Sequence, residues 1–226
     1  MARKLEHDLS DLKDRVLRMG SLVEDAIRKS IKALVERDRE LALAVIDGDA
    51  VVNTHDVEIE EECIRLLAIW QPTGSNLRFI TTAIKIITDL ERMGDLAVDI
   101  CERTIELLEE PQLKPYIDIP RMAEASQKML KDSLDAFVEK DADLAVKVCA
   151  ADDFVDNLNQ QIFNELLVYM LQDPKNIARA VRLTYVAKYL ERVGDHATNI
   201  AEMVVYMVKG KVIRHMACEV REPEKH

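Results

Sequence analysis

One stretch of fourteen residues occurs twice in this chain. Residues 89–102 read Asp-Leu-Glu-Arg-Met-Gly-Asp-Leu-Ala-Val-Asp-Ile-Cys-Glu. Residues 189–202 read Tyr-Leu-Glu-Arg-Val-Gly-Asp-His-Ala-Thr-Asn-Ile-Ala-Glu, with the shared residues at the same places. A repeat at a fixed period of about half the chain indicates two similar structural halves.

Helical spacing places the acidic residues of the first copy on one side of a helix. Upstream of the copy, apolar residues recur three and four positions apart, as on one face of an α-helix; they are Ile80, Ala83, Ile84, Ile87 and Leu90. At about 100° per residue, Glu91 and Asp95 fall one turn apart on the flank of this face, with Asp99 a further turn on.

Both copies break the local rules of helix stability in the same way. Two acidic residues at i and i+4 repel each other by a few tenths of a kcal/mol. Gly94, which lies between them, costs roughly 1 kcal/mol relative to alanine inside a helix. The second copy repeats these features at Glu191, Gly194 and Asp195. We infer that the stretch serves something other than helix stability.

Composition favours an all-α protein that binds neither nucleic acid nor membranes. Only 4% of the 226 residues are aromatic, and alternating β-branched runs are missing. The net charge of −11 disfavours contact with phosphate backbones and anionic membrane surfaces. No apolar run approaches the roughly 18–20 residues of a membrane span, and the N-terminus lacks the apolar core of a signal peptide. We therefore expect a cytoplasmic protein without membrane insertion, whose scattered cysteines are reduced.

Six long helices are predicted from the periodicity, at about residues 5–36, 39–70, 77–109, 121–139, 144–170 and 176–209. Pro111, Pro115 and Pro120 lie close together and mark the boundary between the halves. The predicted organisation is two pseudo-symmetric three-helix bundles, residues 1–112 and 113–212, followed by a tail at 213–226. The halves are offset by 103 residues in their second helices and by 100 in their third helices.

The paired Leu-Glu-Arg-x-Gly-Asp motifs resemble those of the PhoU family. The loop Trp70-Gln-Pro-Thr-Gly-Ser-Asn-Leu-Arg-Phe79 is similar to its Gln-Pro-x-x-x-Asp-Leu-Arg segment. The resemblance covers nearly the whole chain. It implies a negative regulator of phosphate uptake, mostly a homodimer, that reports from the ATP-binding subunit of a phosphate ABC transporter to a sensor histidine kinase.

The resemblance also implies metal binding, because Glu/Asp-x-x-x-Asp motifs hold multinuclear clusters in some members. The metal ligands expected are Glu91, Asp95, Asp99, Glu191, Asp195, Asp49, Asp152 and Asp156. The expected ions are divalent or trivalent, namely iron, Mn, Mg or Zn; ligands that are all oxygen favour Mg, Mn, Ca or iron over a Cys/His zinc site. Asn53 stands where the family usually has an acid, and Asn199 stands opposite Asp99, so equal occupancy of the halves is not assured.

Three alternatives remain open at the level of sequence. Arg92 and Arg192 could neutralise the carboxylates, which would make the pattern purely structural. A metal-free helical adapter could use its acidic surface to bind a basic partner. A carboxylate-bridged metalloenzyme is less favoured, because the helices contain no Glu-x-x-His motif. No Ser-His-Asp arrangement or Gly-rich phosphate loop is present either, so we expect no enzyme; we interpret His196 as a surface or interface residue.

Overall fold

The computed structural model describes residues 2–210, and the predicted tail at 213–226 lies outside this range. The first half consists of α1 (Ala2–Glu36), α2 (Arg39–Trp70) and α3 (Gly74–Leu108). The second half consists of α4 (Asp118–Glu139), α5 (Ala142–Gln172) and α6 (Ile177–Lys209), with a short 3-10 turn η1 (Pro174–Asn176) before α6. The described chain is thus all-α, with two up-down-up sets of three helices, as predicted.

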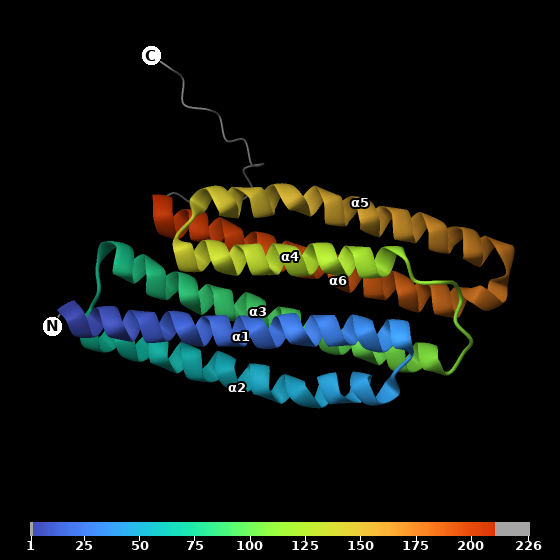
Figure 1. Cartoon of the computed structure of the whole chain (residues 1–226), viewed down its shortest axis with the longest axis horizontal. Helices are drawn as coiled ribbons and strands as arrows, with labels where there is room; N and C mark the ends of the chain where they lie inside the picture. Colours follow the sequence, from blue (N-terminus) through green and yellow to red (C-terminus); the bar gives the residue numbers. More distant parts are fainter. Residues whose placement is uncertain (1, 211–226) are drawn as a thin grey trace, which may run out of the picture.

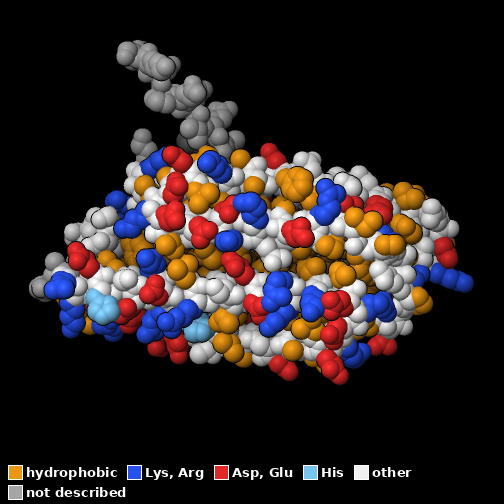
Figure 2. Space-filling model, in the orientation of Figure 1, with side chains coloured by type: hydrophobic (Ala, Val, Ile, Leu, Met, Phe, Trp, Pro, Cys, Tyr) orange, Lys and Arg blue, Asp and Glu red, His pale blue; other side chains and the backbone are white. Residues whose placement is uncertain are grey.

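The two halves lie side by side with their helices nearly aligned (Figure 1). α3 and α6 pack against each other, as do α1 and α4, whereas α2 and α5 lie on opposite outer sides. Figure 2 shows charged side chains of both signs over the face formed by α1 and α4, with hydrophobic side chains along the seam between the halves. No helix among residues 2–210 has the length and apolarity that a membrane crossing requires.

Equivalent aspartates start the second helix of each half. The Asp38 side chain accepts a hydrogen bond from the Leu41 amide at 2.9 Å, and Asp141 accepts one from the Leu144 amide at 3.0 Å. Each aspartate follows a residue in the left-handed conformation, Arg37 or Lys140, which ends the preceding helix. Such N-caps satisfy amides that would otherwise lack a partner, so the break predicted between residues 36 and 39 is a tight turn between two helices.

Buried contacts join the two halves at several points along their length. The Phe79 and Phe137 rings stack between α3 and α4, with centroids 5.1 Å apart. A Cβ at Gly20 of α1 would lie only 2.4 Å from Leu134 Cδ1 of α4, so this glycine permits close packing of the two helices. At the far end, the Arg182 guanidinium on α6 binds Glu106 and Glu110 at 2.8 and 3.2 Å. Apolar packing and ion pairs therefore fix the halves together.

The predicted helix bounds agree with the structure to within a few residues. The largest differences are at the starts of α1, α3 and α4, which each begin three residues earlier than predicted, at Ala2, Gly74 and Asp118. Thr73 is extended and Gly74 takes a φ of 58°, which lets Ser75 and Asn76 join the first turn of the helix. The predicted boundary at residue 112 falls within the link between α3 and α4.

Candidate metal centre

Four carboxylates of the first half face one another across α2 and α3; we call this group the first acidic surface. Asp49 and Asp56 lie on α2, and Glu91 and Asp95 lie on α3. Burial raises the pKa of Glu91, and the charges of Asp95, Asp56 and Asp49 raise it further, because the two helices bring these groups close together. Glu91 and Asp95 of α3 thus lie near Asp49 and Asp56 of α2.

The second half repeats the arrangement; we call Asp152 and Asp156 of α5, with Glu191 and Asp195 of α6, the second acidic surface. Burial raises the pKa of Asp152 to about 6, and the charges of Asp156, Asp195 and Glu191 add to the effect. Burial and Glu191 likewise raise the pKa of Asp195. Four of the predicted ligands therefore form one mutually repulsive group, which a bound cation would relieve.

The two motif glycines allow an aspartate of the neighbouring helix to lie over the helix backbone. A Cβ at Gly94 would lie 3.1 Å from Asp49 Oδ1 and 3.3 Å from Val52 Cγ1. At Gly194 the corresponding distances are 3.2 Å to Asp152 Oδ1 and 3.5 Å to a Val155 methyl. A side chain at either position would press on the carboxylate. The glycine in each copy thus leaves room for this carboxylate, which explains why both copies carry a residue that destabilises the helix.

The same aspartates each carry one buried oxygen that is available to a ligand. Among residues 2–210, Asp49 Oδ1 and Asp152 Oδ1 are buried and have no hydrogen-bond partner. The other Asp49 oxygen, Oδ2, accepts a hydrogen bond from Asn53 Nδ2 at 2.7 Å. A buried acceptor without a partner is costly, and a cation is one group that would satisfy it. The carboxylates fit a metal in donor type and in charge.

Asp56 belongs to the first acidic surface, although it was not among the predicted ligands. The first half has Asn53 and Asp56 on α2, whereas the second half has Asp156 and Asn159 at the equivalent positions. The acid and the amide have exchanged places about one turn apart, so each surface keeps four carboxylates. The sequence signal was the position of Asp56 seven residues after Asp49, two turns along the same face.

Asp99 lies one turn beyond Asp95 on α3, on the side toward α6. Burial and then Asp99 raise the pKa of Tyr189 on α6, and the pKa of Asp99 itself is raised first by burial and then by Glu102 and Asp95. The charges of Arg103 and Arg192 lower that pKa, which places both cations near Asp99. Asp99 therefore lies at the junction of α3 and α6, within electrostatic range of Asp95, and its role as a metal ligand stays a prediction.

His196 and Asn199 lie at the same junction and bind one buried carboxylate. His196 Nδ1 lies 2.8 Å from Asp89 Oδ1, and Asn199 Nδ2 donates to the same oxygen at 3.3 Å. Asp89 is buried on α3, so these contacts cross between the halves. Of the two roles proposed for His196, the structure supports the interface role.

Basic residues neutralise the two acidic surfaces only in part. Arg92 lies 3.4 Å from both Glu91 and Asp95, with a side chain that is 58% exposed. Arg192, the equivalent residue, instead lies near Asp99. In the second surface Lys188 pairs with Glu191. The neutralisation suggested by sequence is thus present, but through different cations in the two halves.

The acidic surfaces are open arrays of carboxylates and not closed cages. Within residues 2–210, no three Asp, Glu, His or Cys side chains converge closely enough to hold a metal ion as they stand. The carboxylates would therefore have to rotate toward a shared ion, with water completing its coordination. Flexible, partly hydrated oxygen sites of this kind suit hard cations.

The two halves differ in the hollows beside these surfaces. A hollow of about 190 Å³ between α1 and α2 reaches Asp49 and Gly94, passing Ala26. In the second half Met129 stands at the position of Ala26, and its Cε lies 3.7 Å from the place of a Gly194 Cβ. In the second half, the Met129 side chain therefore occupies the space that corresponds to the part of the hollow beside Ala26 in the first half.

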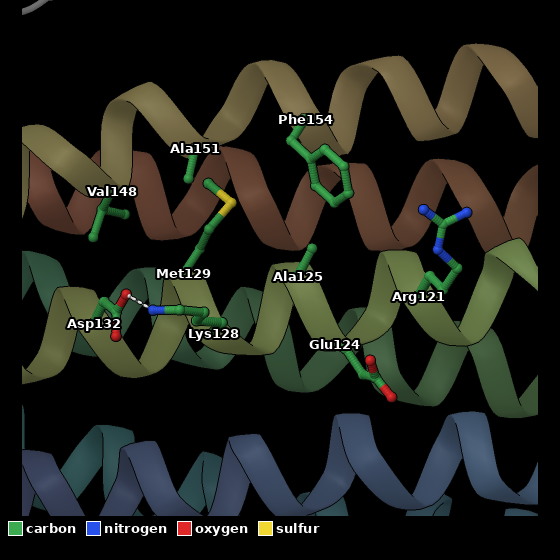
Figure 3. A pocket seen from close by; sticks show the side chains of 9 residues that line it. All are labelled: Arg121, Glu124, Ala125, Lys128, Met129, Asp132, Val148, Ala151 and Phe154. Carbon is green, nitrogen blue, oxygen red and sulfur yellow. Dashed lines mark hydrogen bonds and ion pairs between the residues drawn. The ribbon is translucent and has the colours of Figure 1, made fainter.

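A hollow of about 440 Å³ between α4 and α5 lies on the other side of Met129 from Gly194 (Figure 3). Phe154 points into it, Ala125, Met129 and Val148 also line it, and the ion pair of Lys128 and Asp132 lies at its edge. None of the predicted metal ligands lines this hollow. Its lining is mostly apolar and contains no arrangement of catalytic groups.

Comparison with known proteins identifies one family over both halves. The PhoU domain model matches residues 16–104 and again residues 119–204. The phosphate-specific transport system accessory protein PhoU homolog of Aquifex aeolicus is 45% identical over 212 residues, covering 94% of this chain and 96% of that protein.

Solved structures agree with this match. The crystal structure of PhoU from Pseudomonas aeruginosa superposes with a TM-score of 0.87 at 40% identity, covering 91% of this chain and 99% of that one. The phosphate transport system regulatory protein PhoU from Streptococcus pneumoniae gives a TM-score of 0.86 at 31% identity, covering 92% and 98%.

Proposed function

Because this chain belongs to the PhoU family, whose members are accessory proteins of phosphate transport, we propose that it is a negative regulator of phosphate uptake and of phosphate-starvation signalling. The observation that carries the proposal is the match of both halves, over 94% of the chain, to an accessory protein of a phosphate-specific transport system. The protein acts in the cytoplasm through contacts with other proteins, not by catalysis.

Its proposed partners are the ATP-binding subunit of a phosphate ABC transporter and a sensor histidine kinase. The net charge of −11 argues against direct contact with promoter DNA, which leaves protein contacts as the route to gene expression. Two similar acidic surfaces, one on each half, offer separate places for two partners. We expect the protein to act as a homodimer.

The proposed metal sites are the first and second acidic surfaces. Asp49, Asp56, Glu91 and Asp95 would hold the ions of the first half, and Asp152, Asp156, Glu191 and Asp195 those of the second. The buried oxygens of Asp49 and Asp152 that lack partners support this assignment. A bound ion supplies positive charge that offsets the repulsion among the carboxylates.

A metal-free adapter is the second candidate. It is favoured by the contacts of Arg92 with Glu91 and Asp95, which already neutralise part of the first acidic surface. Under this alternative the remaining carboxylates bind a basic surface of the partner. Metal content separates the two candidates.

Deletion of the gene tests the regulatory role. We expect a starvation-gene reporter, silent in high phosphate in the parent strain, to be switched on in the deletion strain. A plasmid copy carrying Glu91→Lys and Asp95→Lys should restore silencing only in part, whereas Glu61→Lys, an exposed charge reversal elsewhere on α2, should restore it fully. A deletion strain whose reporter still shuts down normally would refute the regulatory assignment.

Elemental analysis tests the metal sites separately. The protein is purified without chelator or affinity metal, and its bound metals are measured per chain. We expect bound metal, and a melting temperature that falls with chelator and recovers when the metal is returned, because the ion binds only the folded state. Melting curves that coincide with and without chelator, across iron, Mn, Mg and Zn, would leave the metal-free adapter.

A further inference from the structure

The outer face of α5 and α6 carries a band of exposed apolar side chains; we call it the apolar band. The residues recur at four-residue spacing along each helix. They are Phe163, Leu167 and Leu171 on α5, and Ile177, Val181 and Tyr185 on α6, and they range from 37% to 78% exposed. A contiguous exposed patch of this kind marks an interaction site in soluble proteins.

The bundle architecture does not require these apolar residues. At the equivalent positions of the first half, Glu60 replaces Phe163, Thr81 replaces Val181 and Lys85 replaces Tyr185. Aromatic residues make up only 4% of the chain, yet two of them are exposed here. Leu167, Leu171 and Ile177 instead correspond to the apolar residues Ile64, Ala68 and Leu77. The apolar side chains at positions 163, 181 and 185 are therefore the part of the band that is particular to the second half.

The band combines protrusions with a hollow. Leu171, at the end of α5, is 78% exposed and projects most. Two turns earlier, a hollow of about 360 Å³ lies between the helices and is lined by Phe163, Tyr185 and the uncharged side chains of Asn159, Gln160 and Thr184, with Lys188. A protruding leucine and an apolar hollow on the same face are complementary in shape.

We propose that the apolar band is the surface on which a second copy of this chain docks, around a twofold axis that passes near Leu167 and Val181. This inference rests on the homodimer of the proposed function and names its interface. Leu167 and Val181 are the middle residues of the band on α5 and α6. A twofold axis that passes near both places Leu171 of one copy on Phe163 of the other copy, and Ile177 of one copy on Tyr185 of the other. Each contact then occurs twice, as in an isologous interface.

The exposed apolar area is sufficient for a dimer. The six side chains together expose roughly 600 Å², given the 150–250 Å² that large side chains can bury. Two copies would bury about 1,200 Å², which is the lower end of the range for specific, stable interfaces. Tyrosine and tryptophan are enriched among the residues that carry the affinity of such interfaces, and the band includes Tyr185.

Charge also favours a second copy at this place. Two chains that each carry −11 repel each other, and they approach most easily where neither presents carboxylates. The six residues of the apolar band are all uncharged. Phe163, the member of the band nearest to Asp156 on α5, lies about 10 Å from it along the helix, at 1.5 Å per residue. The hollow reaches Lys188, which pairs with Glu191, so the dimer would lie beside the second acidic surface.

The proposed interface can be tested by replacing residues of the apolar band with the residues at the equivalent positions of the first half. We expect the wild-type protein to be a dimer by analytical ultracentrifugation. The double variant Phe163→Glu with Tyr185→Lys carries the residues that the equivalent bundle already accommodates, so it should fold. Loss of the contacts that Phe163 and Tyr185 make in each copy should weaken the dimer at least about a hundredfold. Ile64→Glu is the matched control, because Ile64 is the counterpart of Leu167 and is 57% exposed.

The outcomes separate this inference from the regulatory role. If the wild-type protein is a monomer both at about 100 μM and after 100-fold dilution, the proposed dimer interface is overturned. The apolar band would then be a docking surface for a different protein. A dimer broken by Ile64→Glu but not by the double variant would also overturn it, by placing the interface on the first half. Circular dichroism confirms that each variant is folded. The starvation reporter measures the regulatory role independently, so either proposal can fail alone.

Discussion

At the scale of single residues, the acidic surfaces show how two divergent repeats keep the same charge. Asn53 removes a carboxylate from the first half, and Asp56 restores one about a turn away on the same helix face. The second half has the reverse order, with Asp156 followed by Asn159. Because facing helices bring Asp56 within range of Glu91, the local charge is retained although the aligned positions differ.

The raised pKa of Asp152 predicts how its ionisation affects stability. Burial raises this pKa from 3.8 in the unfolded chain to about 6 in the folded protein. An acid with a raised pKa stabilises the folded state when protonated, and this contribution is lost as the pH rises through about 6. We therefore expect Asp152→Asn to raise the melting temperature of the metal-free protein at pH 7.5, with a smaller gain at pH 5.

Thermal melts at both pH values in chelator provide the measurement. Asp47→Asn serves as the control, because Asp47 is an exposed carboxylate on α2 and its replacement should change little. A lower melting temperature for Asp152→Asn at pH 7.5 would mean that the ionised carboxylate has a stabilising partner in the folded protein.

At the scale of helices, the turn between the first and second helix of each half depends on one aspartate. Asp38 and Asp141 cap α2 and α5, as described above. We expect Asp38→Ala and Asp141→Ala each to lower the free energy of unfolding by about 1 kcal/mol, because a first-turn amide loses its acceptor. Urea denaturation checks this value.

The asparagine variants at these positions are the control for capping. Asparagine caps helices about as well as aspartate, so Asp38→Asn and Asp141→Asn should retain most of the stability. If asparagine were as damaging as alanine, the carboxylate charge and not the hydrogen bond would be responsible.

At the scale of the whole molecule, the contacts between the halves predict a single unfolding unit. Phe137 is fully buried and stacks on Phe79 of the other half. We expect Phe137→Ala to cost about 3–5 kcal/mol of unfolding free energy, since it leaves a large cavity between the halves. Calorimetry of the wild-type protein should show one transition, because neither half keeps this contact alone.

Phe154 is the matched control for this change. It is 51% exposed beside the α4–α5 hollow, so Phe154→Ala should cost much less than Phe137→Ala. Two separate calorimetric transitions in the wild-type protein would show instead that the halves unfold independently.

The sequence alone was sufficient to predict the helices and their repetition. Three- and four-residue spacing of apolar residues marked each helix to within a few residues, including the break between residues 36 and 39. Helix formation depends on local hydrogen bonds and on burial of one face. Both can be predicted from the periodic spacing of apolar residues over short stretches of sequence. The repeated motif likewise predicted which helix of each half would carry the acidic residues.

Only the tertiary structure decided which acids meet. Spacing within a helix determines which residues share a face, but it does not determine the rotation of that helix against its neighbour. For this reason Asp56 joins the first acidic surface while Asp99 turns toward α6. The purpose of Gly94 also emerged only with packing, because the carboxylate that occupies its space comes from Asp49, on another helix.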